Sequence, residues 1–132
     1  MTTRGLLDTS YFIAHETGRP IDRDKIPDEG AISVVTLAEL HAGVLSAVDL
    51  DSRARRMVTL NSVAGAKLID IDEPVVLVWA RMRAHLAQQG RRVNVNDLWI
   101  AASAAANDLP VITQDDDFDP LDGIAGLRVI RV

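Results

Sequence analysis

The sequence contains no cysteine. Disulfide bonds, thiolate catalysis and zinc or iron–sulfur centres held by cysteine are therefore excluded. Long apolar runs are also missing, because no stretch approaches the ~18 residues that a membrane span needs. The N-terminal segment carries Asp8 and His15 inside its apolar part, which is untypical of a signal peptide. We expect a cytoplasmic protein with no membrane-spanning segment.

Positive charge is scarce, with 14 Lys+Arg against 19 Asp+Glu and a net charge of −5. Proteins that bind nucleic acids usually have a basic balance, so this argues against such a partner. Two bound divalent cations would bring the net charge from −5 to −1, so the objection is not decisive. The arginines are also grouped along the chain rather than spread evenly. The groups are Arg53, Arg55 and Arg56, then Arg81 and Arg83, then Arg91 and Arg92.

The 132 residues, 48% of them hydrophobic, are enough for one domain with a buried core, spanning 1–132. Short apolar runs alternate with helical patterns. The expected strands are 5–8, 31–36, 67–72, 110–113 and 127–132, and the expected helices are 11–16, 36–48, 49–65, 73–89 and 98–106. This alternation predicts a three-layer α/β/α domain, with a mainly parallel sheet of four to five strands and helices on both faces.

Helix-start signals accompany several of these helices. The candidate caps are Thr36 with Glu39 as an S/T-x-x-E capping box, Asp51 or Ser52, and Asn96 with Asp97. For the helix 73–89, Pro74 falls in the first turn and Gly90 is the expected stop.

Four acidic residues stand where the predicted strands end or the following helices begin. They are Asp8, Glu39, Asp97 and Asp115. Each has an ordinary structural explanation on its own, as a turn, a cap or a solvated charge. Ligands of open α/β sheets bind at the carboxyl ends of the strands, however, and clustered carboxylates require a counter-charge. An all-oxygen set without cysteine favours Mg²⁺, with Mn²⁺ as a possible substitute.

The stretch TQDDDFDP holds four acids in five positions. Asp115 comes first after the predicted strand and is the best placed to face the other three segments. In an extended backbone Asp117 would point to the same side and Asp116 away from it, which makes Asp116 a solvated charge. We expect Asp119, followed by Pro120, to shape the turn rather than to bind metal.

The chain resembles the PIN-domain ribonucleases, particularly the VapC-type toxins of bacterial toxin–antitoxin pairs. The resemblance spans almost the whole chain and rests on LLDTS, TLAEL, NDLWIAASA and VITQDDDF, in that order and at family-like spacing. It implies a PIN-like fold and a metal-binding quartet with one further contributor. The quartet is Asp8, Glu39, Asp97 and Asp115, and the fifth residue is Asp117. By the same resemblance, Ser10 and Thr113 are hydroxyls that support the acids.

The resemblance also implies an activity and partners. The expected activity is Mg²⁺-dependent endoribonuclease cleavage, in the toxin component of a type II toxin–antitoxin system. The expected partners are RNA, a second copy of the chain in a homodimer, and a VapB-like antitoxin whose C-terminal segment blocks the active site.

The hypothesis for the chemistry is that one or two Mg²⁺ ions activate a water for in-line attack on the RNA phosphorus. This would leave 5′-phosphate and 3′-hydroxyl ends. The metal ligands would be Asp8, Asp97, Asp115 and Asp117, and Glu39 would bind metal or orient water. We expect Arg91 and Arg92, just before the Asp97 helix, either to flank the RNA groove or to act as solvated surface charge.

Two other functions fit the sequence less well, and one further alternative stays open. Asp115, Asp117 and Asp119 match the opening of an EF-hand loop, but Pro120 and Gly126 occupy the positions that need Gly and Glu. A phospho-receiver domain needs a lysine after its late strand, and the chain has lysines only at 25 and 67. The remaining alternative is a metal-binding PIN-like module without catalysis that acts through protein partners.

Overall fold

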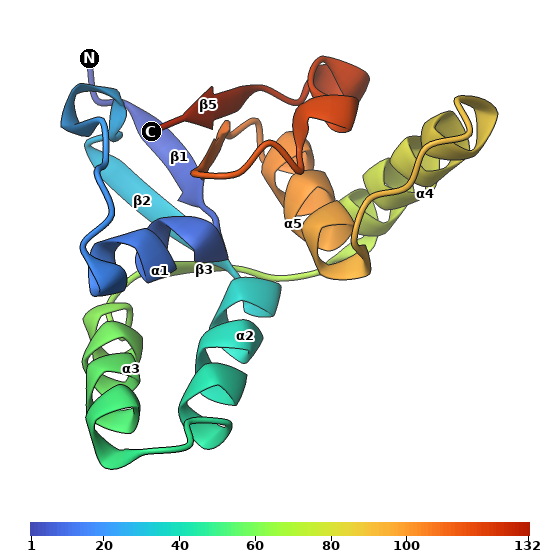
Figure 1. Ribbon diagram of the computed structural model, residues 1–132. Coiled ribbons are helices and arrows are strands. Elements are labelled where there is room, and N and C mark those ends of the chain that lie inside the picture. The colour runs from blue at the N-terminus through green and yellow to red at the C-terminus, as the bar shows by residue number, and fades with distance from the viewer.

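A computed structural model describes all residues from 1 to 132. Five strands and five α-helices alternate along most of the chain, with three short 3-10 helices (Figure 1). The strands are β1 (Arg4–Leu7), β2 (Glu29–Ser33), β3 (Lys67–Ile69), β4 (Val111–Thr113) and β5 (Val129–Arg131). The helices are α1 (Thr9–Thr17), α2 (Val34–Leu45), α3 (Leu50–Ser62), α4 (Glu73–Gln88) and α5 (Val95–Ala106). The 3-10 helices are η1 (Arg23–Lys25), η2 (Asp119–Leu121) and η3 (Ile124–Gly126).

The strands form one sheet in the order β3-β2-β1-β4-β5, and all four neighbouring pairs are parallel. Leu6 of β1 pairs with Ala31 of β2 on one side and with Val111 of β4 on the other. The carboxyl ends of all five strands therefore lie along the same edge. The predicted parallel α/β sheet is confirmed.

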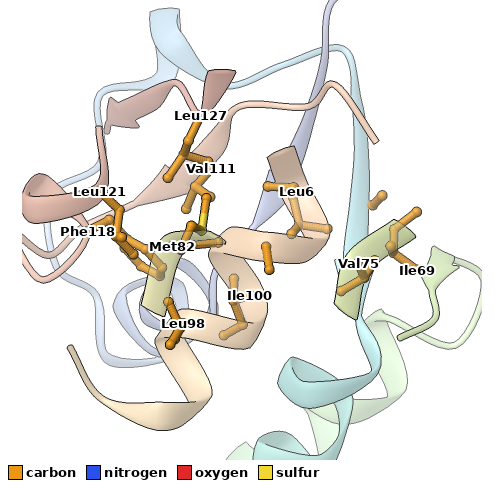
Figure 2. Close-up of a cluster of buried hydrophobic side chains, with 14 of the residues drawn as sticks. Leu6, Ile69, Val75, Met82, Leu98, Ile100, Val111, Phe118, Leu121 and Leu127 are labelled. Carbon is orange, nitrogen blue, oxygen red and sulfur yellow. The ribbon is translucent and has the colours of Figure 1, made fainter. Parts of the chain in front are cut away.

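Successive residues of the central strands point to opposite faces of the sheet, as the pleat requires. Leu6 and Ala31 belong to a large buried cluster with α4, α5 and the C-terminal segment, while Ile32 belongs to a second cluster on the other face. Figure 2 shows the large cluster, in which Met82 and Ile100 pack below the strands. The second cluster joins Ile32 to side chains from α1, α2 and the end of α3: Phe12, Leu40 and Val63. Helices thus cover both faces in a three-layer arrangement.

The helices are paired in space as well as in sequence. Figure 1 shows α2 and α3 as a hairpin that extends away from the sheet, with α4 and α5 as a second pair elsewhere on the molecule. α4 begins with Pro74 in its first turn and ends just before Gly90, whose positive φ of 63° stops the helix, so the predicted helix 73–89 is confirmed. None of the helices combines the length and the apolar character that a membrane crossing requires.

Three predicted helix starts were wrong by two or three residues. Ser33 caps α2, because its Oγ accepts the N–H of Thr36 at 3.0 Å, so Thr36 is a buried helical residue and forms no capping box. Asp49 rather than Asp51 or Ser52 caps α3, and Asn94 rather than Asn96 or Asp97 caps α5. In each case an earlier side chain also has the right geometry to accept a free N–H.

Candidate functional site

Asp8 directly follows β1 and caps α1, and it is 98% buried, with a relative exposure of only 2%. Its Oδ2 accepts hydrogen bonds from Ser10 Oγ at 2.8 Å and from Thr113 Oγ1 at 3.0 Å. Burial raises the pKa of Asp8, and the hydrogen bonds from Ser10 and Thr113 offset part of that rise because they favour the charged form. The carboxylate is held in one orientation at the carboxyl edge of the sheet.

The two hydroxyl residues that hold Asp8 also connect β1 to the end of β4. Ser10 Oγ accepts the N–H of Gln114 at 3.0 Å, and Thr113 Oγ1 accepts the N–H of Asp115 at 3.0 Å. Both side chains are buried, so each hydroxyl has fixed partners on two segments that are about a hundred residues apart in the chain. The start of the acidic stretch is thereby fixed beside Asp8.

Asp97 lies in the first turn of α5 and is half-buried. Burial raises its pKa first, and the charges of four other acids raise it further, to about 7. Those acids are Asp8, Asp117, Glu39 and Asp115. Carboxylates from the β1–α1 junction, α2, α5 and the segment after β4 therefore lie within electrostatic reach of one another, at the edge where parallel strands end.

Asp115 is half-buried, and its pKa is raised by burial, then by the charges of Asp8 and Asp117, while Arg19 lowers it. The backbone bends from Gln114 to Asp116 instead of staying extended, so strand alternation does not set the direction of these side chains. Asp117 is exposed, yet its charge reaches both Asp115 and Asp97.

Asp119, at the start of η2, has a different environment. Its Oδ2 forms an ion pair with the Arg131 guanidinium at 2.9 Å, which ties the turn to β5. This contact agrees with the predicted role of Asp119 in shaping the turn.

Glu39 lies in the second turn of α2, and its Oε1 accepts a hydrogen bond from Thr9 Oγ1 at 2.7 Å. Thr9 Oγ1 is also 3.2 Å from Thr36 Oγ1. Thr9 was not predicted from the sequence to be a site residue, although it stands beside Asp8 in LLDTS. Its contact leaves Oε2 of Glu39 free of protein partners.

Asp8, Glu39, Asp97, Asp115 and Asp117 form the acidic cluster. The chemistry of its oxygen donors fits a hard divalent cation. All its candidate ligands are carboxylate oxygens, which Mg²⁺ and Mn²⁺ prefer. The positive charge of a bound cation would favour the ionised form of Asp97 and would therefore lower the pKa that the neighbouring acids raise. No three acidic or histidine side chains converge closely enough to hold one ion in their present positions. Mutually repelling carboxylates favour such spread positions, because a counter-charge is needed to draw them together.

Arg91 and Arg92 follow the end of α4. They line a groove of about 440 Å³ between α4 and α5. Its other lining residues are Arg83, Leu86, Ala87, Val93, Val95 and Leu98. Arg83 also lies over the ring of Trp79, which stacks on Trp99 with centroids 4.8 Å apart. The groove therefore has a basic rim and an apolar floor, and it adjoins the start of α5.

The family of the chain follows from comparison with known proteins. The model of the PIN domain family matches residues 5–124, which include all the acidic residues of the cluster. The chain belongs to the PIN-domain family.

Two curated relatives share the PIN-type sequence over most of their length. The chain is 58% identical to Ribonuclease VapC5 of Mycobacterium tuberculosis, over 97% of this chain and 95% of the relative. It is 41% identical to Ribonuclease VapC4 of the same species, over 87% of this chain and 88% of the relative. Both alignments cover most of the chain, so the likeness is not confined to the acidic positions.

One solved structure is very similar. It is a member of the VapBC family of toxin–antitoxin systems, VapBC-5, from Mycobacterium tuberculosis. The TM-score is 0.92 at 55% sequence identity, and the match covers 98% of this chain and 99% of the other. The expected PIN-like fold is confirmed.

Proposed function

We propose that the chain is an Mg²⁺-dependent endoribonuclease and the toxin of a type II toxin–antitoxin pair. The observation that carries this proposal is the raised pKa of Asp97, caused by burial and by four acids from three other segments at one edge of a parallel sheet. Such mutual repulsion destabilises the protein unless a bound cation neutralises part of the negative charge. The relatives named as ribonucleases support the RNA-cleaving activity.

In this proposal Asp8, Asp97 and Asp115 hold Mg²⁺ or Mn²⁺, with Asp117 as a further ligand from the exposed side. When bound, such a cation lowers the pKa of a coordinated water and stabilises the charge that develops on the phosphate oxygens. The protein's own contribution is to position the groups. Ser10 and Thr113 hold the Asp8 carboxylate in place through Oδ2.

Glu39 has the role of orienting the attacking water and taking its proton. Thr9 Oγ1 donates to Oε1 at 2.7 Å and fixes the carboxylate, while Oε2 remains available to a water. Removal of that proton allows in-line attack on the phosphorus, which leaves a 5′-phosphate and a 3′-hydroxyl. Arg91 and Arg92, on the rim of the α4–α5 groove, contact the RNA backbone.

The proposed protein partner is a VapB-like antitoxin whose C-terminal segment blocks the acidic site. The similar solved structure is a toxin–antitoxin system, and the acidic cluster would pair well with an arginine of such a segment. The tip of the α2–α3 hairpin exposes Leu45, Val48 and Leu50, each by 80% or more, and exposed apolar side chains of this kind suit a protein partner.

Three further properties belong to the proposal. Residues 1–132 fold as one domain, two copies associate as a homodimer, and the protein acts in the cytoplasm, where its RNA substrate is. Light scattering on the purified chain measures the dimer directly, with twice the mass of 14.4 kDa as the expected result.

The activity is tested by incubating purified protein with total RNA in Mg²⁺, in Mn²⁺ and in excess chelator. Cleavage with either metal and none with chelator is the expected result, and end-mapping should find 5′-phosphates at the cut sites. Metal binding without any cleavage would instead identify a non-catalytic PIN-like module.

A further inference from the structure

A basic pocket of about 370 Å³ lies just after the end of α1. Its lining residues are His15, Gly18, Arg19, Pro20, Ile21 and Arg23. Two guanidinium groups and an imidazole therefore surround the pocket, and no acidic residue is part of its lining. The pocket thus has a local excess of positive charge, although the chain as a whole has a net charge of −5.

The pocket is attached to the acidic edge of the sheet by the chain itself. Gln114, which directly precedes Asp115, donates from Nε2 to the carbonyl oxygen of Pro20 at 3.1 Å and to that of Val132 at 2.6 Å. Gly18, with φ of 74°, ends α1 and turns the chain toward this contact. Arg19 lies close enough to Asp115 to lower its pKa. The pocket and the carboxylates are therefore neighbours.

The two arginines of the pocket are not engaged elsewhere. Neither Arg19 nor Arg23 forms an ion pair within 4.0 Å or donates a side-chain hydrogen bond within the protein, whereas Arg4, Arg128 and Arg131 do both. The nearby acid Asp22 is paired with Lys25 at 3.7 Å and does not neutralise them. Both guanidinium groups are free to bind an anion.

We propose that this pocket binds a phosphate of the RNA strand that neighbours the phosphate to be cut. The inference deepens the proposed function and rests on it. An acidic centre repels the polyanionic strand, so binding requires positive charge beside the carboxylates as well as cations among them. Guanidinium groups suit phosphate oxygens through paired, charge-assisted hydrogen bonds. Arg19 and Arg23 thus position the strand on the α1 side of the cluster.

The test compares two double variants that lose the same charge. Arg19→Gln with Arg23→Gln removes the pocket's arginines, and Arg53→Gln with Arg81→Gln removes two exposed arginines on α3 and α4 as a control. Both are made in the Asp8→Asn background, which keeps a fluorescent single-stranded 12-mer RNA intact in Mg²⁺. Fluorescence anisotropy then gives the Kd at several salt concentrations.

The pocket variant should bind RNA roughly five- to tenfold more weakly than its background, with a slope of log K against log salt smaller by about 0.7, as the loss of one phosphate contact predicts. The control should keep its Kd and its slope. Equal behaviour of the two variants, or no RNA binding by the background protein at low salt, would overturn the inference. So would binding of inorganic phosphate or of a polyglutamate peptide in this pocket while RNA binding is unchanged.

Cleavage by the chain with Asp8 intact distinguishes this inference from the proposed function. If the chain does not cleave RNA in Mg²⁺ but the pocket variant still binds RNA more weakly, the proposed activity is refuted and the pocket remains an RNA-binding site. Arg23→Gln alone should raise KM and leave kcat and its pH profile in place, because Arg23 contacts the strand and not Asp115. A change confined to kcat would show that the arginines act only through the carboxylates and would refute the phosphate contact.

Discussion

The raised pKa of Asp97 predicts that stability without metal falls as the pH rises. The folded protein holds a proton on Asp97 up to about pH 7, whereas the unfolded chain loses it near 3.8. Between these values the folded state binds more protons, so deprotonation favours unfolding. The destabilisation grows from about pH 4 and is complete above about pH 7. The Asp97→Asn variant lacks this pH-dependent destabilisation because the asparagine side chain carries no charge at any of these pH values.

The magnitude follows from the pKa. A rise of the Asp97 pKa from 3.8 to about 7 corresponds to a loss of about 4 kcal/mol in the free energy of unfolding at high pH, before solvent screening is considered. Asp97 is only half-buried, so solvent screening reduces the expected gain of Asp97→Asn at pH 8 to roughly 1–3 kcal/mol. For a chain of 132 residues this raises Tm by about 3–5 °C per kcal/mol.

The assay is urea unfolding of the chain and of Asp97→Asn in chelator at pH 4, 6 and 8. The stability difference should be near zero at pH 4 and should reach its full value at pH 8. Added Mg²⁺ should stabilise the chain at pH 8 and leave the variant unchanged. A difference that is the same at all three pH values would refute the claim that burial and neighbouring carboxylates hold a proton on Asp97.

Two further predictions concern the scaffold of the site. Thr113→Val removes the hydroxyl that donates to Asp8 and accepts the N–H of Asp115, and it should cost about 1–3 kcal/mol in urea unfolding while keeping the fold by circular dichroism. A cost below about 0.5 kcal/mol would mean that this hydrogen bond is not important. Gly5→Ala would place a Cβ 2.7 Å from Cγ1 of the buried Ile112 and should destabilise by about 1–3 kcal/mol. Gly65→Ala is the control, since nothing lies within 4 Å of its Cβ, and an equal loss in both variants would contradict this packing argument.

Much of the fold was predictable because its signals are local. Apolar runs such as that of β4 alternate with helical periodicity, and Pro74 and Gly90 mark the ends of a helix through their own backbone preferences. The parallel sheet follows from that alternation. The exact caps were not predictable, because Thr36 and Ser33 are both good cap residues. The choice of Ser33 depends on where β2 stops pairing with its neighbours.

The site was predictable in part for a similar reason. Strand ends are local features, and a parallel sheet brings them to one edge, so Asp8 and Asp115 were expected to be neighbours. The hydroxyl bridge through Ser10 and Thr113 depends on side-chain packing between distant segments and came only from family resemblance. No local sequence pattern predicts that Arg19 lies near Asp115. Their proximity results from the turn after α1 and from the hydrogen bond of Gln114 to Pro20 in that turn.

The central claim is that the carboxylates at the sheet edge cut RNA with the help of a divalent cation. The most direct measurement is the single-turnover rate of RNA cleavage in Mg²⁺ for Asp8→Asn, with Asp116→Asn as the control of equal charge in the exposed part of the acidic stretch. We predict a loss of at least about a hundredfold for Asp8→Asn, as expected when a group that stabilises the transition state is removed, and a near-normal rate for Asp116→Asn. Equal rates for Asp8→Asn and the unchanged protein would contradict the account.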